Sequence, residues 1–387
     1  MNPDQLSAAL SDLDAQGLRR QRGVLDSPQG VRVHVEGRRF LSFASNDYLG
    51  LANHPAVAEA VRAAISEVGV GAGAAHLLTG HHRLHHELET ALADFSGLSA
   101  ALLFSTGYMA SLGVLSALLD RHGEVFEDRL NHASLVDAAL LARARLSRYP
   151  HLDLSNLEQR LAASTAKVKL IASDTVFSMD GDLCDVAALL VLARRYDAWL
   201  YLDDAHGFGV LGDSGQGILS SVSTPERSPN LIYMATLGKA AGVAGAFVAG
   251  SSDLVAWLVN RARTYIYTTA QPPMLAAGVR ASLGIIAMES WRRAHLQTLI
   301  TRLRRGARGL PWSLMPSPTP IQPLLVGSNE AALMLTRGLR ERGILIPAIR
   351  PPTVPVGTAR LRISLSAAHT LDDIDALLEG LQELAHA

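Results

Sequence analysis

The sequence predicts an α/β fold in which helices cover both faces of a mostly parallel sheet, followed by a smaller α+β unit. The first observation is a series of short runs of strand length, apolar except for Lys169, at residues 101–104, 168–172, 199–202, 231–235 and 246–249. The second is that segments of helical periodicity separate these runs, as the connections of parallel strands require. The third is a change of pattern from about Leu275. We therefore expect an N-terminal segment over residues 1–44, a large domain over 45–274 and a small C-terminal domain over 275–387.

Local signals predict the elements that precede the first strand of the sheet. Residues up to about Phe43 indicate a polar helix and then short strands. Apolar residues recur at helical spacing after Pro55, and proline suits the start of a helix because its missing N–H would be unpaired there. A glycine-rich segment over 69–75 then leads to a second helix, whose apolar face consists of Leu84, Leu88, Leu92 and Phe95.

The C-terminal unit begins with one long predicted helix and a proline-rich connection over 316–320. A strand, a helix, two strands and a final helix are expected after it. Gly343 is placed to end a helix over 330–342, because glycine tolerates the left-handed backbone that closes many helices. Thr370 and Asp373 have the spacing of a capping box that opens the last helix.

Composition excludes several classes of function. The 387 residues carry a formal net charge of −1, which gives no long-range attraction to nucleic acid or to an acidic membrane surface. Cys184 is the single cysteine, so neither an intramolecular disulfide nor a cysteine-based zinc site is possible. No stretch reaches the roughly 18 uncharged apolar residues of a membrane span, and no signal-peptide core is present. We expect a cytoplasmic protein with no nucleic-acid or membrane partner.

Lys239 is the most informative single residue. Only three of the 35 basic residues are lysine, and Lys239 lies alone among small and apolar residues, where a charged side chain is costly to bury. Unlike guanidinium, an ammonium group can lose its proton, so a lysine amine can attack a carbonyl. The segment therefore predicts a lysine that forms a Schiff base, although an ordinary surface lysine in a Gly/Ala turn would look the same locally.

Acidic residues follow the apolar run at 199–202. A carboxylate such as Asp203 at the carboxyl end of a buried parallel strand points into the crevice where open α/β sheets bind ligands. Asp204 and His206 come next, and helix capping is the alternative role for the acids. A lysine for an imine and an acid for a pyridine nitrogen are the two protein groups that pyridoxal phosphate needs most. Lys239 and Asp203, which follow two apolar strands, therefore predict that cofactor.

Further polar residues follow other strands of the predicted sheet. The turn over 105–108 precedes a helix over 109–119, and a helix N-terminus with free N–H groups suits a phosphate. Thr236 offers a second hydroxyl to the same anion. His132 could lie flat on a cofactor ring, and Ser178 could donate a hydrogen bond to its phenolic oxygen. Each of these residues could equally be structural.

Four segments carry a resemblance to a known family: Ser45–Leu51, Phe177–Asp182, Asp203–Gly207 and Thr236–Lys239. They resemble the α-oxoamine synthases, which are fold-type I pyridoxal-phosphate enzymes, and the similarity covers nearly the whole chain. The resemblance implies a large domain with a mostly parallel seven-stranded sheet and a smaller C-terminal domain. The runs over 349–355 and 357–362 narrow it to members that condense L-alanine with a pimeloyl thioester.

The resemblance also implies roles for individual residues. The residues expected to be catalytic are Lys239, which would form the Schiff base, Asp203, at the pyridine nitrogen, and His132 and His206. Those expected to hold the cofactor are Thr106, Gly107, Tyr108, His132, Ser178, Asp203, His206, Thr236 and Lys239. Those expected to bind substrate are Arg19, Asn46, Thr353 and Arg362, the last at the amino acid's carboxylate. A homodimer is implied, with active sites at the subunit interface and residues 267–269 directed towards the neighbouring site.

The activity implied is a decarboxylating condensation of L-alanine with pimeloyl-CoA or pimeloyl-acyl carrier protein, within the assembly of the biotin ring. The alternatives are another α-oxoamine synthase, such as a glycine C-acetyltransferase, an aminotransferase, or a silent pyridoxal-phosphate-binding protein. One departure from the family pattern is that Ala74 and Ala75 stand where serine is usual. The histidines at 81, 82, 85 and 86 are expected to form a solvated first helical turn, since no carboxylate completes a metal set, and no metal is predicted.

Overall fold

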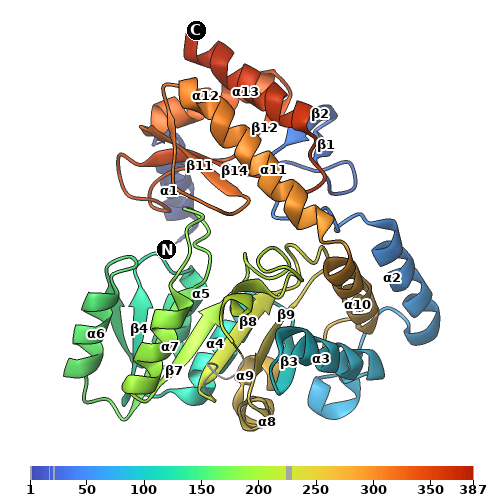
Figure 1. The fold of residues 1–387 in the computed structure, drawn as a ribbon, viewed down its shortest axis with the longest axis vertical. Coiled ribbons are helices and arrows are strands. Elements are labelled where there is room, and N and C mark those ends of the chain that lie inside the picture. Colours follow the sequence, from blue (N-terminus) through green and yellow to red (C-terminus); the bar gives the residue numbers. More distant parts are fainter. Residues whose placement is uncertain (1, 17, 21, 224–228, 387) are drawn as a thin grey trace.

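A seven-stranded sheet forms the centre of the larger part of the chain in the computed structural model, which describes residues 2–16, 18–20, 22–223 and 229–386 (Figure 1). The strand order is β3-β9-β8-β7-β6-β4-β5. In that order the strands span Ala100–Phe104, Ala246–Gly250, Leu231–Thr236, Ala198–Asp203, Val168–Asp174, Gly123–Asp128 and Arg145–Tyr149. β9 runs antiparallel to both of its neighbours, and the other neighbouring pairs are parallel. The predicted mostly parallel sheet is confirmed.

Helices cover both faces of this sheet, as its uniformly apolar strands require. On one face, the side chains of β3, β6 and β7 pack with α3 (Arg83–Ser96), α6 (Leu154–Ala163) and α7 (Val186–Arg195). The other face packs against α4 (Gly107–Leu118), α5 (Ala133–Leu141), α8 (Ser252–Arg261) and α9 (Arg263–Ile266). α2 (Pro55–Val68) and α10 (Pro273–Met288) lie side by side next to α3.

The smaller C-terminal part is built on a four-stranded sheet of order β10-β11-β14-β13. These strands span Ser313–Leu314, Ile321–Gly327, Ala359–Ser364 and Ala348–Ile349. The helices are α11 (Trp291–Gly306), α12 (Asn329–Glu341) and α13 (Leu371–His386). The prediction of one long helix after Leu275 is wrong, because the backbone leaves the helical region at Glu289 (φ −99°, ψ 61°) and separates α10 from α11.

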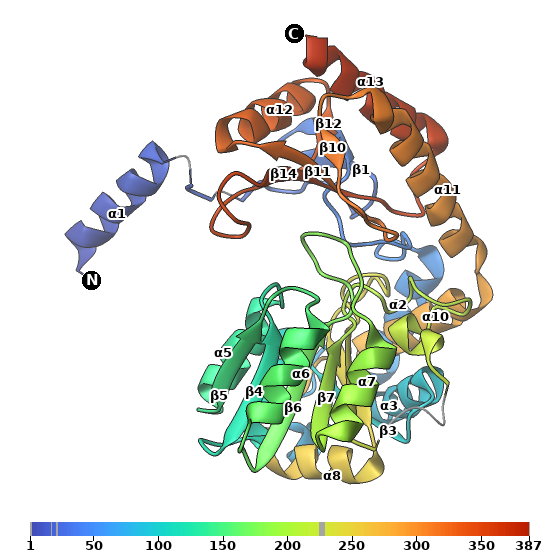
Figure 2. The same cartoon turned by 60° about the vertical axis from the view of Figure 1, so that its left-hand side comes forward.

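The N-terminal strands join the C-terminal part of the chain. β1 (Arg32–Val35) pairs with β2 (Arg38–Ser42), and β2 pairs in parallel with β12 (Ile344–Leu345). Helix α1 (Pro3–Ala15) stands apart from the rest of the chain and exposes three leucines (Figure 2). The boundaries 1–44, 45–274 and 275–387 stay a proposal.

Two predicted helix ends have the expected geometry. Gly343 has a φ of +77°, directly after the residue that ends α12. At the start of α13, Asp373 N–H donates to Thr370 Oγ1 at 3.2 Å and Thr370 N–H donates to Asp373 Oδ2 at 2.8 Å.

Of the helices in the described ranges, none combines the length and the apolar character needed to cross a membrane.

The histidine-rich start of α3 does not form the solvated turn that the sequence predicts. His85 is completely buried, and the Glu89 carboxylate lies 3.8 Å from His81 Nε2. The expectation was wrong for two reasons. The chain before the helix turns back over it at His76–Gly80, and Glu89 lies on the same side of α3 as the preceding histidines.

His151 holds the loop between β6 and α7, which carries Ser178. Its ring nitrogens bond Asp128 at 2.9 Å and Asp182 at 2.8 Å, and its ring meets Phe177 edge-on. Burial opposes the imidazolium charge, but the two carboxylates outweigh this and raise the pKa of His151 to about 10. The loop is therefore fixed to the end of β4 by a charged histidine at neutral pH.

A pH-dependent contribution to stability follows from this contact. Because the folded pKa is raised, the stabilisation is complete below the unfolded value of 6.5 and is lost as the pH rises through about 10. We expect His151→Gln to lower the urea midpoint at neutral pH, and the difference from the unchanged protein to shrink above pH 10. Urea titrations at both pH values check this. An equal deficit at both would show that the imidazolium charge contributes nothing.

Candidate active site

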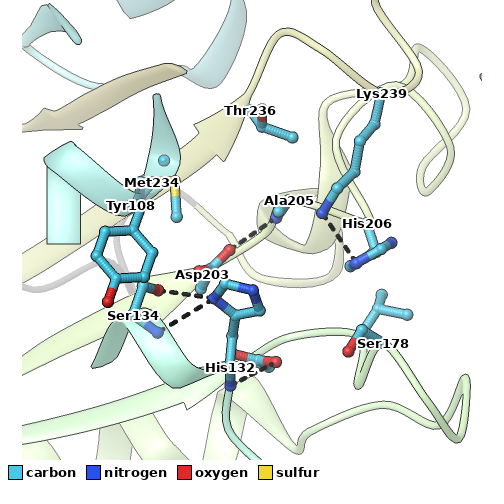
Figure 3. Close-up of a pocket in the computed structure, with 13 residues that line it drawn as sticks. Tyr108, His132, Ser134, Ser178, Asp203, Ala205, His206, Met234, Thr236 and Lys239 are labelled. Atoms are coloured by element: carbon cyan, nitrogen blue, oxygen red, sulfur yellow. Dashed lines mark hydrogen bonds between the residues drawn. The ribbon is translucent and has the colours of Figure 1, made fainter. Parts of the chain in front are cut away.

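A cavity of about 210 Å³ lies at the carboxyl ends of the central strands (Figure 3). Its lining consists of Gly107, Tyr108, His132, Ser134, Asp174, Val176, Ser178, Asp203, Ala205, His206, Met234, Thr236 and Lys239. Eight of these were predicted from the sequence: Gly107, Tyr108, His132, Ser178, Asp203, His206, Thr236 and Lys239. Residues from four crossover connections and one hairpin therefore meet in one space.

Lys239 lies in the short connection between β8 and β9. Because these strands are antiparallel, the chain returns over residues 237–245, and Leu237 N–H donates to Gly245 O at 2.8 Å. Gly242 has a φ of +69°, and a Cβ there would lie 2.5 Å from the Ala52 backbone nitrogen, so only glycine fits. Burial lowers the pKa of Lys239 to about 8, although Asp203 and Asp174 pull it upwards. A substantial neutral-amine population therefore exists near physiological pH.

His206 links the lysine to a buried hydrogen-bonded chain. Lys239 Nζ lies 2.9 Å from His206 Nε2, and His206 Nδ1 lies 2.6 Å from Tyr48 Oη. Tyr48 in turn donates to Asn46 Oδ1 at 3.1 Å. If the tyrosine proton points to Asn46, His206 must carry its proton on Nδ1, and Nε2 accepts from the lysine. Burial lowers the pKa of His206 well below its usual value, so the ring is neutral.

The two adjacent acids have different surroundings. Asp203 ends β7 in the cavity wall and accepts a hydrogen bond from Ala205 N–H at 3.1 Å. Burial raises the pKa of Asp203, while Lys239 opposes the rise. Asp204 turns into the core, where it accepts from Thr175, from Tyr233 Oη at 2.7 Å and from Ile218 N–H at 2.9 Å. Of these two adjacent acids, Asp203 is the one that lines the cavity.

Asp174 is a cavity residue that the sequence prediction missed. It ends β6 directly beside Asp203, with which it is paired in register. Both of its carboxylate oxygens lie 3.2 Å from His132 N, so it fixes the backbone that carries the predicted stacking ring. The sequence pattern could have identified Asp174, because it comes shortly after the apolar run at 168–172, just as Asp203 comes after the run at 199–202.

The start of α4 lies at the cavity wall, where its N-terminal N–H groups could accept an anion. Thr106 caps the helix by accepting from Met109 N–H at 3.1 Å, so the helix begins at Gly107, two residues before the predicted start. Gly107 and Tyr108 line the cavity, and the first amide groups of a helix have no acceptor within it. The Thr236 hydroxyl donates to Gly245 O at 3.1 Å, so it must rotate to donate to a phosphate.

The donor set fits pyridoxal phosphate. A lysine with a lowered pKa, a buried carboxylate and a helix N-terminus match the aldehyde, the pyridine nitrogen and the phosphate of that cofactor. The lysine, the carboxylate and the helix N-terminus come from different elements around the cavity. The aldehyde, the pyridine nitrogen and the phosphate of the cofactor are likewise separate from one another.

Asn46 and Arg362 lie behind the cavity wall instead of lining it. Arg362, from β14, donates through Nε to Ser178 O at 2.6 Å, through Nη1 to Asn46 Oδ1 at 3.1 Å and Ser364 Oγ at 2.7 Å, and through Nη2 to Tyr48 Oη at 3.3 Å. Guanidinium has five N–H groups, so one remains for a ligand in this arrangement. The small C-terminal part thus reaches the loop that carries Ser178.

Arg19 and Thr353 are not brought into the cavity. They line a separate groove of about 760 Å³ between α1 and the segment over 348–353. Arg19 pairs with Asp14 at 2.5 Å, and Arg20 Nη2 donates to Thr353 Oγ1 at 3.4 Å. The predicted substrate residues are therefore divided between two places in this structure.

Comparison with known proteins identifies the family. The family model for aminotransferase class I and II matches residues 38–381. An 8-amino-7-oxononanoate synthase from Nitrosomonas eutropha is 58% identical over 386 residues, covering 100% of both chains. The chain belongs to the 8-amino-7-oxononanoate synthase family. Another member, from Thiobacillus denitrificans, is 59% identical over 382 residues, or 98% of each chain.

Solved structures agree with this family and with its fold. A serine palmitoyltransferase from Sphingomonas wittichii matches with a TM-score of 0.92 and 28% identity, covering 99% of this chain and 97% of that one. The 8-amino-7-oxononanoate synthase of Francisella tularensis matches with a TM-score of 0.77 and 30% identity, covering 90% and 98%. The predicted resemblance and the predicted fold-type I architecture are confirmed.

Proposed function

We propose that this protein is a pyridoxal-phosphate-dependent acyltransferase that condenses L-alanine with a pimeloyl thioester and releases carbon dioxide in biotin biosynthesis. The family membership supports this reaction. The observation that carries it is the cavity in which the Lys239 amine lies 2.9 Å from the neutral His206 ring and shares its walls with the buried Asp203 carboxylate.

The residues of this chain have distinct tasks in that reaction. When bound, pyridoxal phosphate supplies a carbonyl for covalent capture of an amine and a ring that takes up electrons released at the substrate's α-carbon. Lys239 would hold the cofactor, and its amine, with a pKa of about 8, would be suited to accept the α-proton of alanine. Asp203 would stabilise a proton at the pyridine nitrogen, and His132, whose backbone is held by Asp174, would stack on the ring.

The carboxylate of the alanine substrate needs a cationic partner. Arg362 would bind the alanine carboxylate, because guanidinium matches its planar geometry, and anchoring that group selects which α-bond is held for cleavage. Its one remaining N–H can reach one carboxylate oxygen, and a contact with both oxygens requires exchange of its bond to Asn46 or Tyr48. Ser178 would donate to the phenolic oxygen of the cofactor, and His206 would donate to it through Nε2 once Tyr48 donates to His206 Nδ1 in place of Asn46. Thr106, Gly107, Tyr108 and Thr236 would hold the phosphate.

Product analysis tests the function. Purified protein loaded with the cofactor is incubated with alanine, glycine or serine and with pimeloyl or acetyl thioesters, and products are identified by mass spectrometry. We expect 8-amino-7-oxononanoate from alanine and the pimeloyl thioester. A product from glycine and acetyl-CoA alone would indicate a glycine C-acetyltransferase, and transfer of an amino group without carbon dioxide release would indicate an aminotransferase.

We expect a preference for pimeloyl over octanoyl thioester. The groove beside the segment over 350–355 presents Arg20, Arg350 and the Thr353 hydroxyl, and a site that pairs with a terminal carboxylate discriminates against a methyl-ended chain. Thr353→Val should narrow the preference by raising KM for the pimeloyl substrate, with little change in kcat. Steady-state kinetics with both thioesters measures it. Equal kcat/KM for the two in the unchanged protein would contradict the assignment of this groove.

A homodimer and a cytoplasmic location belong to the same proposal. Tyr267 is 72% exposed, with Arg263 stacked 4.8 Å above its ring, and we place this face against a second subunit's site. Mixing an inactive Lys239→Ala chain with a chain altered at 267–269 tests the arrangement. Activity regained on mixing requires a shared interface, and a monomer by light scattering would contradict it.

A further inference from the structure

A cluster of potential metal ligands lies at the start of α3, outside the active-site cavity. His81, His86 and Glu89 each offer one ligand atom, and these atoms all lie within 4.8 Å of one another. His81 follows the turn at His76–Gly80, whereas His86 and Glu89 are three residues apart on one side of the helix. His86 is exposed, and the other two are partly buried, so the cluster has an open side.

Hydrogen bonds show which histidines in this region are held in structural contacts and which could bind a metal ion. His85 Nδ1 accepts from His82 N–H at 3.1 Å, and its Nε2 lies 2.9 Å from Gln271 O. Both nitrogens of His85 are thereby occupied, so it cannot bind a metal without losing a backbone contact. His82 is also engaged, since it accepts from Leu84 N–H to cap the helix.

His76 fixes the orientation of His81. Their Nδ1 atoms lie 3.0 Å apart, and His76 stacks on Tyr265 with ring centroids 4.8 Å apart. One of the two rings must donate the shared proton. If His81 donates it, its Nε2 carries a lone pair, and this is the atom that faces Glu89 at 3.8 Å. A hydrogen bond from the second ring nitrogen fixes the tautomer and the orientation of a metal-binding histidine, and His76 would do this for His81.

The Glu89 carboxylate is 12% exposed, and within the described residues no lysine or arginine forms an ion pair with it. One oxygen accepts from Leu103 N–H at 3.0 Å, while the other faces His81. The 3.8 Å between that oxygen and His81 Nε2 is longer than a hydrogen bond and is close to the separation of two donor atoms on one metal ion. A divalent cation would satisfy the carboxylate and both imidazoles at once.

We propose that His81 Nε2, His86 and the free Glu89 oxygen bind one Zn²⁺ ion, with water at the open side. Two histidines and one glutamate form a donor set that zinc accepts in proteins. The ligand atoms must move closer by about 1 Å to reach the usual coordination distances, which the exposed His86 side chain can supply. The ion would attach the turn at His76–Gly80 to α3, and its role would be structural because Lys239 lies elsewhere.

Calorimetric titration of the cofactor-loaded protein with ZnCl₂ tests the proposal. We expect one ion per chain and a concentration-dependent rise in Tm, because a ligand that binds the folded state stabilises it. His86→Gln should weaken Zn²⁺ binding at least about tenfold. His86 is exposed and caps nothing, so this variant should fold normally. His122→Gln, which changes an exposed histidine between α4 and β4, should leave the affinity unchanged.

Two further variants separate zinc binding from general effects. His76→Phe retains a ring for Tyr265 but removes the partner of His81, and it should weaken binding by about 10-fold to 100-fold. Glu89→Gln should lose binding while activity with alanine is unchanged at saturating cofactor. Absence of Zn²⁺ binding, or equal affinity in the His86→Gln and unchanged proteins, would overturn the proposal.

Discussion

Lys239→Ala is expected to abolish the condensation and to remove the covalent cofactor adduct that borohydride reduction traps. In the proposed reaction the amine would both hold the cofactor and take the α-proton, and loss of an acid–base group alone costs about 10²-fold to 10⁴-fold. Peptide mapping after reduction should place the cofactor on Lys239 in the unchanged protein. The rate of covalent capture should rise with pH and level off above about 8, because the neutral amine attacks and burial lowers the pKa of Lys239.

The other two lysines provide matched controls. Lys167→Ala and Lys169→Ala change residues just before or within β6, away from the cavity lining, and should retain both the adduct and the activity. An adduct mapped to either residue, or one retained by the Lys239→Ala protein, would contradict the assignment.

Asp203→Asn is expected to lower kcat by about 10²-fold to 10³-fold, the range found when one fixed electrostatic group is removed from an active site. An amide is neutral, so it cannot stabilise a proton at the pyridine nitrogen as the carboxylate does. The variant should still fold, because the Ala205 N–H contact can be kept by the amide oxygen. Steady-state kinetics and the absorbance change on adding alanine measure the loss.

Asp204→Asn is the matched control for Asp203→Asn. Asp204 accepts three hydrogen bonds in the core and does not line the cavity, so its replacement should lower Tm and leave the cofactor's spectrum intact. An unaltered rate in Asp203→Asn, or a specific spectral loss in Asp204→Asn, would place the cofactor contact elsewhere.

Most of the sheet and the cavity lining could be predicted from the sequence because burial leaves a strong pattern. The five apolar runs became strands, and polar residues directly after them met at one edge, as with Asp203. β5 was missed because it is an edge strand with two arginines and little burial, so it lacks that pattern. The break between α10 and α11 was missed because neither proline nor glycine marks it.

Other features depend on contacts between distant segments. The burial of His85 depends on the Gln271 carbonyl, which is 186 residues away, and the histidine spacing alone cannot show it. The same holds for Arg362, whose carboxylate-binding role was predicted but whose bonds to Asn46 and Ser178 are tertiary. Asp174, by contrast, could have been found by the rule that found Asp203.

The tight hairpin beneath Lys239 has a consequence for how far its amine can travel. The backbone over 237–245 is bonded to itself and, at Gly242, lies against Leu51 and Ala52, so it cannot follow the substrate. All movement of Nζ between the cofactor, the α-carbon and His206 must come from rotation about the side-chain bonds. The side chain at 239 therefore needs the full length of lysine for its amine to reach these positions. An amine one methylene shorter, such as ornithine incorporated at this position, would not be rescued by a shift of the chain.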